Sequence, residues 1–134
     1  MTAFRKIYCC GCRQDVDARL TDGREIYQHR EDLLGFPFWR CDNCGNYVGC
    51  HHKTRNPTEP LGDIPTQEIR EARKKLHKLI DNILRGGKIS RSEVYRAISA
   101  EIGWDYHTAK IRTIEDAMVV YKAASKLVQQ HRAT

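Results

Sequence analysis

The chain has 134 residues, 40% of them hydrophobic and 30% charged, which suits one domain or two small units that share a core. No stretch approaches the roughly 20 apolar residues of a membrane span, and the first dozen residues contain no apolar run of signal-peptide length. Membrane and exported classes are therefore not expected. In a reducing cytoplasm, six cysteines indicate a metal site rather than disulfides.

The positive charge is concentrated in the second half of the chain. The formal net charge is +6, and residues 61–134 carry 14 Lys and Arg against nine Asp and Glu, whereas residues 1–60 carry nine against eight. A basic excess attracts phosphates, so a nucleic-acid partner is one interpretation. A well-solvated helical surface is the other, and charge alone does not separate the two.

The most specific motif consists of two cysteine pairs, Cys9 with Cys12 and Cys41 with Cys44. A two-residue spacer lets both thiolates turn inward around one tight turn, and two such turns supply the four tetrahedral sulfurs that Zn²⁺ prefers. We therefore predict one structural zinc ion. Four thiolates leave no open coordination position, so catalysis at this metal is not expected.

The residues around the cysteines predict short strands. A strand over 4–8 leads into the first pair, and strands at 38–40 and 47–52 flank the second pair. Thr21-Asp22-Gly23 predicts a further hairpin turn, because glycine tolerates the positive φ that such a turn requires. Two hairpins with cysteines near their tips describe a zinc ribbon over residues 1–57. The run Cys50-His51-His52 leaves open that one of these residues replaces a cysteine as ligand.

After a proline-rich linker at 53–65, the hydrophobic period changes from 2 to 3.6, which predicts a helical domain over residues 58–134. Ser90 and Glu93 form a capping box at the start of the second helix. We expect an α+β fold in which the N-terminal four-cysteine ribbon packs on a C-terminal bundle of three to four helices. The helices are expected at about residues 66–85, 91–102, 106–112 and 114–130.

Four polar residues of the first helix, Arg70, Arg73, His77 and Asp81, fall along one flank of its apolar stripe. His77 and Asp81 are four residues apart, so the carboxylate can orient the imidazole. We favour a polar seam between helix and ribbon, to which His51 also contributes. A phosphate site or a nuclease that uses His77 and Asp81 is the weaker interpretation, because no paired carboxylates or serine nucleophile accompany them.

Residues 98–112 have the rhythm of a helix-turn-helix, with Gly103 at the turn and Asp105 as a cap. In that arrangement several side chains of the second helix can meet DNA. They are Tyr106, His107, Lys110 and Arg112. A purely structural three-helix corner gives the same pattern, and we favour that interpretation.

Several of these motifs occur together in one family. The motifs are Cys9-x-x-Cys12, Phe38-Trp39-x-Cys41-x-x-Cys44, Tyr47-Val48-Gly49-Cys50-His51, Pro60-Leu61-Gly62, the set Arg70, Arg73, His77 and Asp81, and Ser90-Arg91 with Tyr95. With them the chain resembles the small zinc-finger-containing proteins of bacteriophages and prophages, over roughly residues 8–121. Arg13 departs from the family, which prefers glycine there. The resemblance implies bound zinc, a viral or mobile-element origin and the cytoplasm of a bacterial host, but no activity, because the family is of uncharacterised function.

The sequence as a whole favours a non-enzymatic nucleic-acid-binding module of phage type. Zinc would hold the ribbon, and the helical half would contact phosphates through Arg70, Lys74, Lys78, Lys110 and Arg112. The alternative is a protein-interaction module that inhibits or adapts a host protein. Neither a membrane nor a small-molecule substrate is expected.

Overall fold

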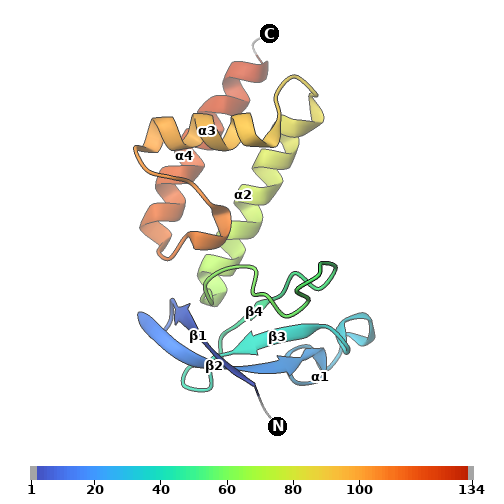
Figure 1. Ribbon diagram of the computed structural model, residues 1–134. Helices are drawn as coiled ribbons and strands as arrows, with labels where there is room; N and C mark the ends of the chain where they lie inside the picture. Colours follow the sequence, from blue (N-terminus) through green and yellow to red (C-terminus); the bar gives the residue numbers. More distant parts are fainter. Residues whose placement is uncertain (1–2, 133–134) are drawn as a thin grey trace. The chain divides into compact units, whose positions relative to one another are not determined.

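The computed structural model describes residues 3–132 and divides into two compact units, Met1–Gln67 and Glu68–Thr134. The first unit contains the strands and the second the long helices, which confirms the α+β class (Figure 1). Within the described residues, none of the helices has the length and apolar character needed to cross a lipid bilayer.

The first unit is built on a four-stranded antiparallel sheet in the order β1-β2-β3-β4. Ile7 of β1 pairs with Val16 of β2, and Trp39 of β3 pairs with Val48 of β4, so buried apolar side chains face each other on one side of the sheet. The strands are β1 (Phe4–Cys9), β2 (Gln14–Asp22), β3 (Pro37–Arg40) and β4 (Tyr47–Gly49).

The linker after β4 belongs to this sheet unit. Ile64 is fully buried; its N–H donates to the carbonyl of Tyr8 at 2.8 Å, and its own carbonyl accepts from the N–H of Cys10 at 2.8 Å. The N–H of Leu61 donates to the carbonyl of Gly49 at 2.9 Å. The first unit therefore extends to Gln67, whereas the sequence assigns residues 58–67 to the helical domain.

The hairpin turn predicted at Thr21-Asp22-Gly23 is wrong. β2 continues to Asp22, whose side chain accepts from the N–H of Arg24 at 3.0 Å and caps the one-turn helix α1 (Gly23–Ile26). A short 3₁₀ helix, η1 (Glu31–Leu33), then leads back to β3, which is the strand that β2 pairs with. Asp-Gly occurs in hairpin turns, but Asp also caps helices. The dipeptide alone therefore does not distinguish a hairpin turn from the start of a helix.

The second unit contains α2 (Gln67–Arg85), α3 (Arg91–Ile102) and α4 (Ile114–Arg132). The capping box is confirmed, since Ser90 Oγ accepts from the Glu93 N–H at 3.2 Å, and Gly103 ends α3 with a φ of 86°. Fully buried apolar side chains from all three helices and from the segment before α4 form the core. They include Leu76, Ile80, Val94, Ile98, Ile111 and Val120.

Instead of the predicted helix at 106–112 there is a single 3₁₀ turn, η2 (Thr108–Lys110). Both its flanking residues, His107 and Ile111, are in extended backbone conformations. The N–H of Tyr106 donates to the hydroxyl of Ser99 at 2.9 Å, so the segment is bonded to α3 and does not form an α-helix of its own.

We predict that Gly23→Ala will lower the free energy of unfolding by about 1–3 kcal/mol, as overpacking does. A Cβ at this position would lie 1.8 Å from the carbonyl oxygen of Leu33, a backbone atom that cannot rotate away. Urea denaturation of the zinc-loaded protein measures the change.

Gly35→Ala is the matched control, because a Cβ at Gly35 meets nothing within 4 Å. It should change stability by less than about 0.5 kcal/mol. Equal effects of the two substitutions would contradict the tight packing of Gly23.

Candidate metal centre

The first cysteine pair lies at the tip of the β1–β2 hairpin. Cys9 ends β1 opposite Gln14, and its carbonyl accepts from the N–H of Arg13 at 2.8 Å, which closes the turn that carries Cys12. Arg13 has a φ of 59°, in the left-handed region that favours glycine. This backbone conformation explains why glycine is suited to the position where the chain carries arginine.

The second pair lies at the tip of the β3–β4 hairpin and closes in the same way. The carbonyl of Cys41 accepts from the N–H of Gly45 at 2.8 Å, and the N–H of Cys41 donates to the carbonyl of Asn46 at 2.8 Å. Gly45, which follows directly after Cys44, has a φ of 80°, in the left-handed region that glycine adopts without strain.

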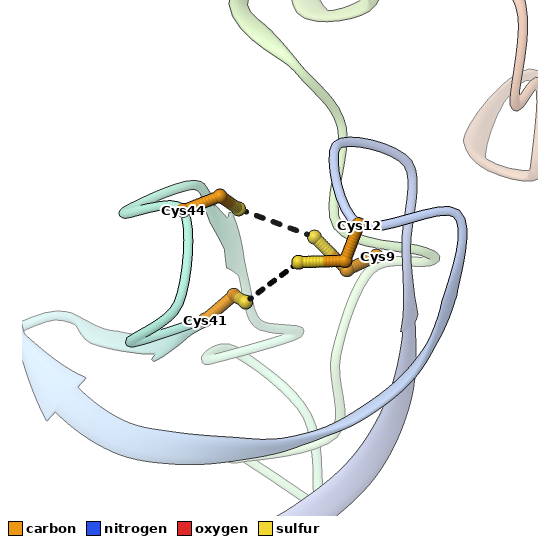
Figure 2. Close-up of side chains that lie close together, drawn as sticks. All are labelled: Cys9, Cys12, Cys41 and Cys44. Atoms are coloured by element: carbon orange, nitrogen blue, oxygen red, sulfur yellow. Dashed lines mark hydrogen bonds between the residues drawn. The ribbon is translucent and has the colours of Figure 1, made fainter.

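The four sulfurs converge between the two tips (Figure 2). Cys9 Sγ lies 3.4 Å from Cys44 Sγ, and Cys12 Sγ lies 3.6 Å from Cys41 Sγ, and all four sulfurs are within 4.8 Å of one another. A tetrahedral ion with Zn–S bonds of about 2.3 Å needs sulfurs about 3.8 Å apart. The donor set and its spacing therefore fit one zinc ion with four thiolate ligands.

The site is buried on one side and open on the other. Cys9 and Cys41 are 0% and 1% exposed and are part of the apolar core, whereas Cys12 is partly exposed and Cys44 is exposed. Asn46, which the sequence analysis missed, donates from Nδ2 to Cys44 Sγ at 3.2 Å. Such a donor orients the sulfur and reduces the negative charge that a four-thiolate site accumulates.

The protein shifts the pKa values of the metal-free thiols in opposite directions. Burial raises the pKa of Cys9. Burial also acts to raise that of Cys44, but hydrogen bonds from the Asn46 backbone and from the neighbouring thiols outweigh it and lower the pKa of Cys44. Zinc must displace the proton that burial keeps on Cys9.

Cys10 and Cys50 lie outside the four-sulfur cluster. Both are buried, and burial raises the pKa of Cys50 to about 11, so this residue is a thiol at neutral pH. His51 and His52 are exposed, and the ring of His52 stacks on Phe36 with 4.3 Å between centroids. Among the residues that the structure describes, the four cysteines are the one group placed to hold a metal, so the alternative ligands within Cys50-His51-His52 are not used.

The polar residues that the sequence places on one flank of α2 make different contacts. Arg73 is 9% exposed, and its guanidinium donates to the carbonyl of Ile111, so it bonds α2 to the segment before α4 inside the helical unit. Asp81 forms an ion pair with Arg91 at 3.7 Å, a partner that the sequence analysis missed. Partial desolvation lowers the pKa of exposed His77, and the charges of Arg91 and Arg73 lower it further against the opposing effect of Asp81.

The placement of Tyr106 on a DNA-reading helix is wrong. Tyr106 is 1% exposed, its hydroxyl bonds to that of Thr108, and its ring packs edge-on against Tyr95 with 5.1 Å between centroids. The other predicted readers, His107, Lys110 and Arg112, are exposed around the single 3₁₀ turn. Sequence periodicity misassigned Tyr106 because a segment this short does not define a helical face.

The chain matches a known protein family. The family model DUF3268, described as a zinc-finger-containing domain, matches residues 5–131. No curated protein and no solved structure matches the chain significantly.

We predict that Cys41→Ser will abolish stoichiometric zinc binding and unfold the sheet unit, because structural zinc contributes on the order of 10 kcal/mol to folding of small domains. Elemental analysis of the purified protein measures the zinc, and amide NMR spectra measure the fold of residues 3–67.

Cys50→Ala is the control, because Cys50 is equally buried but lies outside the sulfur cluster. It should retain one zinc per chain. Loss of zinc in Cys50→Ala, or its retention in Cys41→Ser, would show that the ligand set is different.

We also predict that Tyr106→Phe will lower the free energy of unfolding by about 1 kcal/mol, the usual contribution of a hydrogen bond, and will leave nucleic-acid affinity unchanged. Tyr121→Phe, at a tyrosine that is 46% exposed, should leave both quantities unchanged. Thermal or urea unfolding measures stability. A Tyr106→Phe protein that is as stable as the unmodified chain but binds nucleic acid more weakly would contradict the burial of Tyr106.

Proposed function

Because the chain belongs to the DUF3268 family of zinc-finger-containing domains, we propose that it is a non-enzymatic nucleic-acid-binding module whose zinc is structural. In this proposal the zinc-bound sheet is a folded scaffold, and α2 supplies the surface that contacts phosphates. A phage or prophage origin and action in the bacterial cytoplasm belong to the same proposal.

The distribution of charge between the two units supports this assignment. Residues 1–67 carry nine Lys and Arg and nine Asp and Glu, whereas residues 68–134 carry 14 and eight. The entire formal net charge of +6 therefore lies in the helical unit. A polyanion is attracted to that unit and not to the zinc unit.

The observation that carries the proposal is a row of basic side chains on α2, which we call the basic ridge. It consists of Arg70, Lys74, Lys78 and Arg85. At 100° per residue these positions fall within about 80° of one another, beside the buried stripe. The two lysines and Arg85 are exposed, and Arg70 is half-buried. The first three members rise about 6 Å from one to the next, and the whole ridge is about 22 Å long.

One acidic side chain of α2 that lies beside the ridge is paired with a residue outside it. Asp81, the acidic residue on the same side of α2, is paired with Arg91. Partial desolvation lowers the pKa of His77, which favours the neutral ring and keeps its contribution to the charge of the ridge small. We do not propose a nuclease, because both His77 and Asp81 lie on an exposed helical surface and Asp81 faces Arg91.

Long basic side chains on one helical face contact phosphates rather than base edges. We therefore expect binding that weakens steeply with salt and depends little on sequence. His107, Lys110 and Arg112 are further exposed polar residues of the helical unit and are expected to contribute secondary contacts.

We predict that the double variant Lys74→Ala with Lys78→Ala will bind nucleic acid more weakly and with a shallower salt dependence. Affinity falls as salt rises, so the slope of log affinity against log salt is negative. Removing two phosphate contacts reduces the magnitude of this slope by about 1.8 for duplex DNA and about 1.4 for single strands. Fluorescence anisotropy with labelled duplex and single-stranded oligonucleotides over a salt series measures both quantities.

The matched control is Lys6→Ala with Lys53→Ala, which removes the same charge from exposed positions of the zinc unit. It should leave the slope unchanged. Equal slopes for the unmodified chain and the α2 variant, or equal losses in both variants, would refute the basic ridge as the binding surface.

A further inference from the structure

A groove between α2 and α4 lies wholly within the helical unit and is not used by the proposed function. Its volume is about 740 Å³, and it is lined by the first halves of both helices. Its apolar lining includes Ala72 and Leu76 of α2 and Ile114, Met118, Val119 and Tyr121 of α4.

The groove side of α4 exposes three large apolar side chains. Met118 is 65% exposed, and Val119 and Tyr121 are each 46% exposed. A different side of the same helix packs into the core of the helical unit, because Ala117, Val120 and Ala124 are buried. α4 therefore has a second apolar face, and contiguous exposed patches of this kind mark interaction sites.

The charges on the rim have a regular polarity. Glu68 of α2 is followed seven residues later by Lys75, and Glu115 of α4 is followed seven residues later by Lys122. Seven residues correspond to a rise of about 10 Å. Both helices begin at the same end of the helical unit (Figure 1), so the acidic end of the groove is the same for both.

We propose that this groove is a self-association surface, occupied by the same groove of a second copy of the chain. A two-fold axis across its middle turns the acidic end of one copy toward the basic end of the other, so each glutamate faces a lysine. The apolar side chains between the charged ends, Met118 foremost, are then covered by their own counterparts.

The local charge distinguishes this surface from the basic ridge. The groove rim contains three glutamates, with Glu71 as the third, and two lysines, so it is nearly neutral within a strongly basic unit. Two copies are not repelled there, and a polyanion is not attracted there. Lys75 projects about 100° around α2 from Lys74 and about 60° from Lys78, and none of the four residues of the basic ridge lines the groove.

The first test is the mass of the zinc-loaded full chain by analytical ultracentrifugation over a concentration series. We expect a monomer–dimer equilibrium in the unmodified chain. Met118→Asp should raise the dimer dissociation constant at least about tenfold, as loss of a central apolar contact does. Phe4→Asp is the control, because Phe4 is 62% exposed and lies on the zinc unit; it should leave the constant unchanged.

The second test uses rim variants with opposite charge. Lys75→Glu with Lys122→Glu makes the whole rim acidic, and Glu68→Lys with Glu115→Lys makes it mainly basic. Each variant alone should be monomeric, and an equimolar mixture should form a one-to-one heterodimer. All substituted positions lie on the groove rim, and circular dichroism and one bound zinc per chain verify that the variants are folded.

An unmodified chain that stays monomeric to about 1 mM, where even weak pairs form, would overturn the proposal. So would a dimer that survives Met118→Asp, or a mixture of the two rim variants that stays monomeric. These measurements contain no nucleic acid, so their result is independent of the proposed function.

Discussion

The sheet unit depends on one constraint, the meeting of two hairpin tips around four cysteine sulfurs. The chain between Cys12 and Cys41 passes through β2, α1 and η1, and β2 pairs with β3 next to the second tip. Bringing four thiolates within bonding distance of one ion fixes both tips at once. Cys9 and Cys41 are also core residues, so the metal site and the hydrophobic core of this unit are one structure.

In the helical unit, buried polar bonds hold the irregular part of the chain against the apolar core. The guanidinium of Arg73 and the ring and hydroxyl of Tyr106 fix the irregular connection between α3 and α4. A buried polar group without a partner is costly, so these bonds specify one path for a connection that has little regular secondary structure. α2 of the same unit presents two different surfaces, a basic one and an apolar one with charged ends.

The parts of this structure that the sequence predicts are those with a local physical cause. Cysteine spacing, the Ser90–Glu93 capping box and Gly45 each determine their neighbourhood through contacts a few residues away. The failures depend on partners that are distant in sequence. Asp22-Gly23 became a helix cap because β2 pairs with β3, and Tyr106 became a core residue because Tyr95 and Thr108 enclose it. The carbonyl partner of Arg73 lies 38 residues away and carries no sequence signal at all.

The segment that leads from β4 to the helices has a consequence for how the sheet meets other chains. Ile64 forms a parallel bridge to Cys9 on outer strand β1, and Pro60 forms an antiparallel bridge to Cys50 next to outer strand β4. One stretch of about five residues thus covers part of both borders of the sheet, where unpaired backbone groups would otherwise recruit foreign strands and promote aggregation. A fragment trimmed to the end of β4 would keep every metal ligand and yet lose this protection, so solubility, and not zinc affinity, sets the shortest useful version of the unit.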